Sequence, residues 1–267
     1  MGLLRRLFGG GPVRVETVAT FFTQVRDDAV VEVAGEAYRQ GNVALARAPG
    51  PDELPPGLPA PPSGQFKAML LREPTNQYDS NAVKVLLWAG RDWTMSGYLP
   101  RHEAVTYRLL FDHLQAGLSD RGAPEVAAIV CDAARINERG GLGVVLHLGT
   151  PGECIVELAT EDVVASEGHR WRGASVAFTG RLVTTIHGVP LDRMAQAMLA
   201  RWAGCEFAPR VTKKTEALIV ADANDATGNL QRARDYGIPI ITEQEFLAAI
   251  GLAPGIVGRD VTRWARG

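Results

Sequence analysis

Three tyrosines and one arginine give the front half of the sequence the residue types that hold unpaired nucleic-acid bases. Tyr78 lies in the middle of a polar loop, and Tyr38 and Tyr98 lie near the ends of expected strands. Arg101 follows Tyr98 by three residues. Aromatic rings stack on unpaired bases, and arginines bind phosphate groups. This combination predicts a pocket for a single strand of nucleic acid.

The loop that carries Tyr78 also allows a purely structural interpretation. It lies in the run 72–85, in which a strand, a polar loop and a second strand follow one another. Four of its residues are common turn formers, whose short polar side chains bond to the nearby backbone. An ordinary hairpin loop explains these four but leaves the tyrosine unexplained, so both interpretations remain open. The turn formers are Asn76, Asp79, Ser80 and Asn81.

Short strands must position this loop. Runs of β-branched or apolar residues between turn formers predict six strands, and apolar residues at helical spacing predict a helix between Pro100 and Gln115. Six short strands with one helix are typical of a small barrel or sandwich. A proline-rich run, 49–62, interrupts this module as a spacer. The strands are expected at 30–35, 66–72, 82–88, 93–99, 126–134 and 143–148.

Three separate blocks of the front half resemble a HIRAN domain. They are Val33–Tyr38, Leu71–Val85 and Ser96–Ala104, and the resemblance spans about 28–150. It implies an all-β, OB-like barrel with one or two helices, which captures the 3′-hydroxyl end of single-stranded DNA. The sequence departs from the end-binding relatives at two places. It has Ala-Tyr-Arg at 37–39 for a basic-aromatic-aromatic triplet, and Tyr98 for a histidine of the pocket.

The resemblance gives several of these residues a role. It implies that Tyr38 and Tyr78 stack on or flank the terminal bases, and that Asp79 accepts the hydrogen bond of the 3′-hydroxyl. Arg101 falls where the family has a basic residue for a backbone phosphate. The full set of expected DNA contacts is Tyr38, Arg39, Asn76, Tyr78, Asp79, Tyr98 and Arg101.

The back half alternates strands with helices. Strands are expected at 174–178, 205–211, 217–220 and 238–241, and helices at 191–203, 228–236 and 243–250. This alternation predicts a parallel sheet flanked by helices. Glycines at the expected helix ends and a Thr-Glu-Gln-Glu capping box at 242–245 support the helix assignments.

Blocks of the back half resemble a BRCT domain of the bacterial DNA ligase type. They lie at 173–181, 211–220 and 233–246, and the resemblance spans about 172–252. It implies a phosphate pocket, which suits the carboxyl ends of parallel strands and the free amides of a helix N-terminus. The alternative is that the glycine after the first strand only makes a tight turn. The pocket residues would be Thr179, Gly180, Arg181, Asn229 and Arg232, with Asn229 where the family has a lysine.

The length of 267 residues suits two domains better than one. We expect an N-terminal arm at 1–27, the front domain at 28–150, a linker at 151–171, the back domain at 172–252 and a tail at 253–267. No run approaches 18 uninterrupted apolar residues, so we expect no membrane span.

The composition limits how such a protein could bind DNA. A formal net charge of -2 speaks against coating nucleic acid by bulk electrostatics, so any DNA contact must be local. Lysine is rare against arginine, a bias typical of a GC-rich bacterial genome. Cys131, Cys154 and Cys205 lack metal-ligand spacing and read as thiols of a reducing cytoplasm, where the protein would associate with the nucleoid.

A catalytic constellation is not visible in the sequence. No lysine follows a glycine-rich loop, and the five histidines lack the paired spacing of zinc peptidases. Adjacent acids at 27–28 and 161–162 leave a metal-dependent nuclease as an alternative. We therefore predict a non-catalytic protein of DNA repair or replication, without metal or cofactor, that binds 3′ ends and docks on DNA or a repair protein. The other alternative is an adaptor that binds proteins only.

Overall fold

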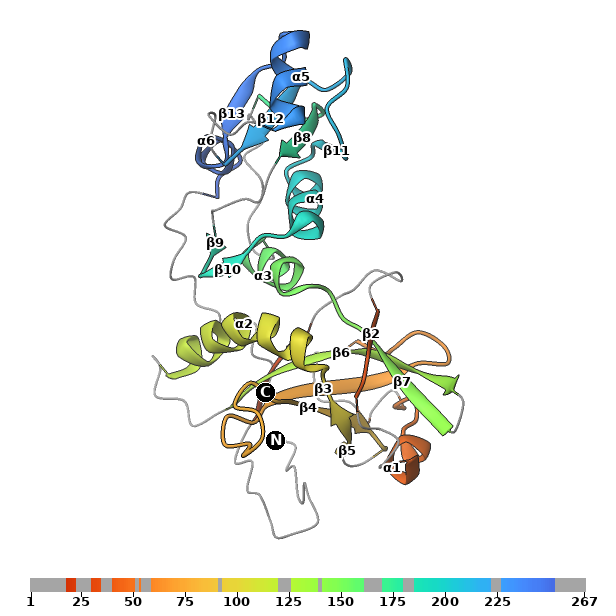
Figure 1. The fold of residues 1–267 in the computed structure, drawn as a ribbon. Coiled ribbons are helices and arrows are strands. Elements are labelled where there is room, and N and C mark those ends of the chain that lie inside the picture. The colour runs from red at the N-terminus through yellow and green to blue at the C-terminus, as the bar shows by residue number, and fades with distance from the viewer. Residues whose placement is uncertain are drawn as a thin grey trace. The chain divides into compact units, whose positions relative to one another are not determined.

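The computed structural model describes residues 18–22, 30–34, 40–50, 53, 59–90, 93–119, 126–138, 141–160, 170–179, 185–221 and 227–252. Contacts within the chain define two compact units, one up to Gly149 and one from Thr150 to Arg259. We call them the front unit and the back unit (Figure 1). The expected tail, 253–267, and much of the proline-rich run lie outside the described residues.

The front unit is built on one curled sheet with the strand order β2-β7-β6-β3-β4-β5 (Figure 1). Neighbours in this order are antiparallel. Each strand lies at one of the six runs that the sequence predicts. The bounds are β2 Val30–Glu32, β3 Phe66–Arg72, β4 Val83–Trp88, β5 Trp93–Tyr98, β6 Val126–Glu138 and β7 Gly141–His147.

A backbone bridge joins the two ends of this sheet. Ala34, just past β2, donates to the carbonyl of Tyr98 at 2.8 Å and accepts from its amide at 2.9 Å. Val33 bonds at the same time to Val144 of β7, 3.0 Å away. A Cβ atom at residue 97 would press into the Ala34 carbonyl oxygen, so Gly97 permits this close approach. The bridge fixes the end of β5, where the candidate site begins.

Two elements of the front unit were not foreseen. The strand β1 (Val18–Phe22) pairs in parallel with β6, so the prediction of an arm over 1–27 is wrong for these five residues. Its short apolar run has no periodicity that would tell a strand from a loose segment. The helix α1 (Gln40–Leu45) has six residues. The side-chain amide of Gln40 forms hydrogen bonds with both the carbonyl and the N–H group of Leu142.

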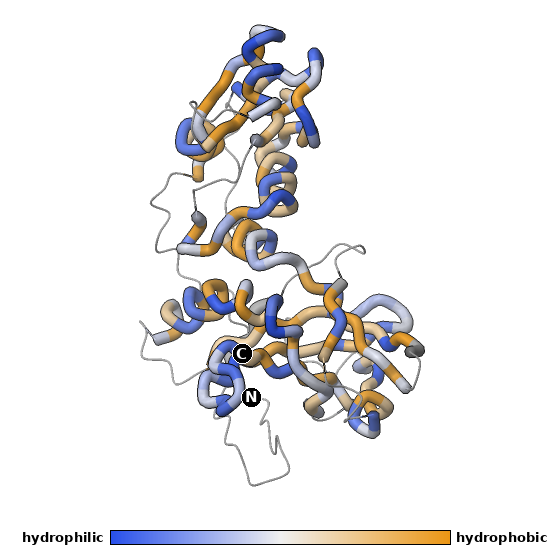
Figure 2. Tube along the Cα trace, in the orientation of Figure 1, coloured by the Kyte–Doolittle hydropathy of each residue, from blue (hydrophilic) through white to orange (hydrophobic). Residues whose placement is uncertain are grey.

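The helix α2 (Arg101–Ser119) follows β5 directly and runs four residues further than expected. Apolar residues at helical spacing, among them Leu110 and Leu114, are fully buried, and the helix contacts β6. Hydrophilic and hydrophobic residues alternate along it in Figure 2. Each such buried leucine contributes about 1.5–3 kcal/mol relative to an exposed one. The packed helix holds its first residue, Arg101, just beyond the end of β5.

One face of the front sheet carries a cluster of buried apolar residues from four strands. It includes Trp88 and Trp93, whose rings meet edge to face with their centres 5.3 Å apart. The fully buried Lys67 is paired with Asp132 at 2.6 Å, which compensates the loss of water around the ammonium group. Tyr98 packs against the rim of the cluster. The cluster consists of Met69, Leu71, Leu86, Trp88, Trp93, Met95, Ala128 and Val130.

The back unit contains a parallel sheet with the strand order β11-β8-β12-β13. Its strands and helices overlap the predicted segments, and α5 and β12 have the predicted bounds. The strands are β8 Ser175–Thr179, β11 Glu206–Ala208, β12 Ala217–Val220 and β13 Ile240–Thr242. The helices are α4 Arg193–Trp202, α5 Gly228–Tyr236 and α6 Glu243–Ala249.

Helices cover both faces of this sheet. Leu230 and Ala233 of α5 belong to one buried cluster with Ala177 and Leu218 of the strands. On the other face, the ring of Phe246 from α6 meets that of Phe178 at 5.6 Å. The predicted capping box is confirmed at Thr242. Gly237 ends α5 in the left-handed conformation that the sequence predicts for it.

The predicted linker over 151–171 is wrong in its first half. Pro151–Thr160 form the helix α3, which contacts α4 and the hairpin of β9 (Thr185–Ile186) and β10 (Val189–Pro190). The amide of Thr150 donates to the carboxylate of Glu153 at 2.9 Å, and the amide of Glu153 donates to the threonine hydroxyl at 3.2 Å. This reciprocal pair satisfies two amides at the helix start. Among the described residues, no helix could cross a membrane.

Candidate nucleic-acid interface

The loop between β3 and β4 is closed by backbone hydrogen bonds. Glu73 donates to the carbonyl of Ala82 at 2.8 Å, and Ala82 donates to that of Asp79 at 3.0 Å. Asn76 donates to the carbonyl of Glu73 at 2.9 Å. The loop is therefore a structured turn and not a loose connection. We call 73–82 the site loop.

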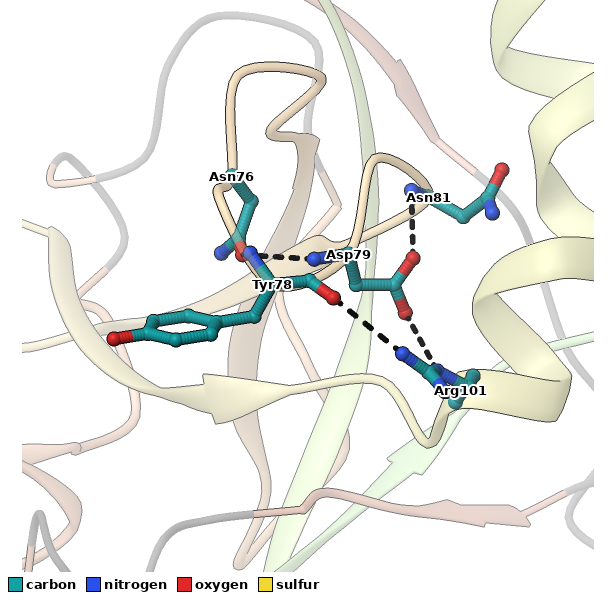
Figure 3. Close-up of polar contacts among 5 residues, drawn as sticks. All are labelled: Asn76, Tyr78, Asp79, Asn81 and Arg101. Carbon is teal, nitrogen blue, oxygen red and sulfur yellow. Dashed lines mark hydrogen bonds and ion pairs between the residues drawn. The ribbon is translucent and has the colours of Figure 1, made fainter.

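The side chain of Asn76 organises this loop from within (Figure 3). Its carbonyl oxygen accepts from the amides of Tyr78 at 2.9 Å and Asp79 at 3.1 Å. Its amide group donates to the carboxylate of Glu73 at 2.8 Å. These bonds use the side chain inside the loop, so Asn76 positions Tyr78 and Asp79.

Asp79 and Arg101 hold the other end of the site loop (Figure 3). One carboxylate oxygen of Asp79 accepts from the amide of Asn81 at 2.9 Å, and the other accepts from Nε of Arg101 at 3.1 Å. Nη2 of Arg101 also donates to the carbonyl of Tyr78 at 3.4 Å. The Asn81 amide and the guanidinium hold the pKa of Asp79 below its usual value. Asp79 is therefore an ionised acceptor at neutral pH.

Tyr78 presents its ring to the solvent. The residue is 82% exposed, and Figure 3 shows the ring directed away from Arg101. The side chain of Arg101 is 76% exposed. A large aromatic residue gains nothing for the fold by such exposure, which leaves the ring free to stack on a flat partner.

Beneath the site loop lies an ion-paired hub that the sequence interpretation missed. The carboxylate of Glu73 is paired with Lys84 and accepts from the hydroxyl of Tyr98 at 3.0 Å. Burial raises the pKa of Glu73, but hydrogen bonds from Lys84, Asn76 and Tyr98 outweigh it and lower the pKa overall. Glu73 thus ties together two strands and the site loop. Its position at the end of β3 was the only signal in the sequence.

The site loop, the end of β5 and the start of α2 line one pocket of about 610 Å³. Leu99 and Ala104 supply apolar wall, and Glu73 is also among the lining residues. Five of the seven predicted DNA contacts line the pocket, and the other two, Tyr38 and Arg39, lie outside the described residues. The five are Asn76, Tyr78, Asp79, Tyr98 and Arg101.

In the back unit, the structure brings Thr179 at the end of β8 to the start of α5. Its hydroxyl lies 3.0 Å from that of Thr227, which caps the helix by accepting from Leu230 at 3.2 Å. Asn229 is the second residue of the helix and Arg232 is exposed one turn further on. The remaining predicted pocket residues, Gly180 and Arg181, lie outside the described residues.

The cysteines of the described part of the chain are buried thiols. Burial raises the pKa of Cys131 above its ordinary range, and it raises the pKa of Cys205 to about 11. Such thiols are not poised as nucleophiles. Within the described ranges, no cluster of histidine, cysteine and carboxylate side chains has the arrangement of a metal site.

Comparison with known proteins gives one class of relative. Aligned segments are 32% identical over 98 residues to a DNA ligase of Acidiphilium cryptum, 33% over 94 to that of Syntrophobacter fumaroxidans and 33% over 96 to that of Rhodopseudomonas palustris. They cover 37%, 35% and 36% of this chain. About a third of the chain is related to DNA ligases. The match spans only 13%, 13% and 12% of the ligases. No family model matches the chain.

Proposed function

We propose that this is a non-catalytic DNA-binding protein of repair or replication, whose front unit captures the 3′-hydroxyl end of single-stranded DNA. The observation that supports this most is the pocket in which an ordered loop carries an exposed ring and an ionised carboxylate, and the first residue of α2 adds an exposed guanidinium. The residues are Tyr78, Asp79 and Arg101. They are the groups that a terminal nucleotide needs for its base, its 3′-hydroxyl and its phosphate.

The charges explain a preference for a hydroxyl end. An ionised Asp79 accepts hydrogen bonds only, so it favours a hydroxyl donor and repels a phosphate at the same place. Each oxygen accepts one bond in the structure and keeps capacity for another. Arg101 has five N–H donors and uses two of them on the loop, so others remain for a backbone phosphate.

We further propose that the ligase-like segment is the back unit and that it is a BRCT-type module. The match, 94 to 98 residues long, would fit within the back unit, which runs from Thr150 to Arg259. The sheet with β8 between β11 and β12, and the threonine hydroxyls at the start of α5, fit that proposal. This unit would dock on DNA or on a repair protein.

Fluorescence anisotropy tests the proposal on the intact protein. Three oligonucleotides of one sequence would end in a 3′-hydroxyl, a 3′-phosphate or a 5′-phosphate with a blocked 3′ end. We expect the 3′-hydroxyl strand to bind most tightly. Equal affinity for all three would contradict end capture. Absence of binding would favour the adaptor, which contacts proteins alone.

A further inference from the structure

We propose that the back unit contacts the DNA backbone a second time, through the turn Thr212–Thr215 and independently of any strand end. This deepens the proposed function, since it rests on a DNA-binding role for the protein. The turn presents Lys213 and Lys214, and Lys213 lies beside Tyr236, the last residue of α5. We call it the lysine turn.

Hydrogen bonds of Thr212 and Thr215 close the lysine turn. Thr215 donates to the carbonyl of Thr212 at 3.0 Å, and its own hydroxyl accepts from the amide of Thr212 at 3.0 Å. The hydroxyl of Thr212 accepts from the amide of Lys214 at 3.2 Å. Thr215 is 4% exposed, whereas both lysines are exposed. The turn is therefore preorganised, and the lysine side chains take no part in holding it.

The position of these lysines is unusual within this chain. Lysine occurs only four times, and Lys67 and Lys84 are both used inside the front unit by ion pairs. The remaining two are adjacent on this turn. Among the described residues, neither has a carboxylate partner. The exposed Arg210 precedes the turn and adds a third cation.

The two neighbouring acids make their hydrogen bonds away from the lysines. The carboxylate of Glu216 accepts from the amide of Ser175 at 2.8 Å, and that of Asp235 accepts from Gln231 at 2.8 Å. Nζ of Lys213 stands 5.8 Å from the centre of the Tyr236 ring, which is 45% exposed. This cation–π contact holds one ammonium group at the surface. The lysine turn therefore carries two exposed ammonium groups without an ion-pair partner among the described residues.

A structural role accounts for only part of this arrangement. A cation near the last turn of α5 is favourable with the helix dipole, which would explain Lys213. It does not account for Lys214, whose side chain takes no part in the hydrogen bonds that close the turn. Two adjacent ammonium groups on a rigid turn suit successive phosphates of a DNA strand, a contact without sequence preference.

The lysine turn is separate from the predicted phosphate pocket. It precedes β12 and so lies at the amino ends of the parallel strands. Thr179 and Thr227 lie at the carboxyl end of β8. The two features lie at opposite ends of the parallel strands, so each can be substituted without changing the residues of the other.

A covalently closed circle of single-stranded DNA isolates this contact because it has no end. Binding to the full chain would be measured over a series of salt concentrations. Each phosphate contact on a single strand contributes about 0.7 to the slope of log K against log salt. We expect the Lys213→Ala, Lys214→Ala double variant to lower that slope by about 1.4. The double change to arginine should keep it.

Matched controls separate this proposal from the front pocket. Arg201→Ala removes one exposed cation of α4 and should leave the slope unchanged, whereas Lys214→Ala should lower it. The circle offers no 3′ end to the front pocket, so the slope on the circle reports on contacts that need no strand end. If the double lysine variant keeps both the slope and the melting curve of the wild type, the proposed DNA contact of the lysine turn is wrong. The proposal is also wrong if the wild-type protein binds a phosphopeptide but not the circle. A 3′-hydroxyl preference on linear DNA would still support end capture.

Discussion

The site loop of the front unit and the carboxyl edge of the back unit's sheet both follow the end of a strand, yet they are equipped differently. In the site loop, one asparagine and two ion-paired carboxylates hold an exposed ring in place, and one of these carboxylates pairs with the exposed guanidinium of Arg101 in α2. At the back edge, two threonine hydroxyls meet at a helix start, and Asn229 stands where a cation is expected. The comparison teaches that the end of a strand does not by itself make a binding site, because the side chains placed there decide what can bind.

The largest effect should come from opening the front sheet. Gly97→Ala would push a methyl group into the carbonyl of Ala34, the backbone bridge that joins the sheet's ends. We expect a loss of about 1–3 kcal/mol or more in the free energy of unfolding, together with loss of 3′-end binding. Denaturant unfolding measures this. Gly41→Ala is the matched control, because nothing lies within 4 Å of its added carbon. An unchanged stability in the first variant would show that the bridge is dispensable.

Removal of the exposed ring tests the front site without disturbing its fold. Tyr78→Ala should weaken single-strand binding by about 1–3 kcal/mol for the stacked base, equally for every sequence. Tyr78→Phe keeps the ring and should keep the affinity. Both variants should unfold like the wild type, because the side chain is 82% exposed. A sequence-dependent loss in titrations with different homopolymers would argue against simple stacking.

A cation restored at the back edge should have a smaller effect. Asn229→Lys places an ammonium group near Thr179 and makes a phosphate hydrogen bond charge-assisted, which is roughly twice as strong as a neutral one. We expect a gain of about 1 kcal/mol in the binding of a 5′-phosphorylated oligonucleotide. Thr179→Ala in the same background should remove the gain. Tight binding by the wild type would mean that Arg232 or the helix start suffices.

The pH dependence of the site loop should be modest and one-sided. The pKa of Glu73 in the folded protein lies below its ordinary value of 4.5, so its ionised form stabilises the fold above that pH. The contribution is lost as the pH falls through the folded value. The melting temperature should therefore fall more steeply between pH 7 and pH 3 for the wild type than for Glu73→Gln. Parallel curves would show that Glu73 contributes nothing through its charge.

Local patterns in the sequence revealed most of the elements but not their long-range partners. The bounds of α5 and β12 followed from periodicity and turn residues, because those signals lie within the elements themselves. The capping pair of α3, Thr150 and Glu153, is also a local signal, and it lies at the start of the segment for which a linker is expected. Its apolar residues after the cap were the overlooked signal.

The site itself could be predicted only in part, for a related reason. The turn formers and Tyr78 are close in sequence, so the sequence alone predicts the loop. The hub at Glu73 depends on Tyr98, 25 residues away, and no local pattern joins them. The parallel pairing of β1 with β6 and the bridge at Ala34 are backbone contacts, which residue types do not predict.

The most direct test of end capture is the coupling between Asp79 and the chemistry of the strand end. Dissociation constants would be measured for the wild type and Asp79→Ala, each with a 3′-hydroxyl and a 3′-phosphate strand of one sequence. Hydrogen bonds to charged groups contribute about 1.5–3 kcal/mol, so the wild type should prefer the hydroxyl by about tenfold or more. Asp79→Ala should bind both strands alike and keep part of the stacking affinity. The same preference in both proteins, or none in the wild type, would contradict the account.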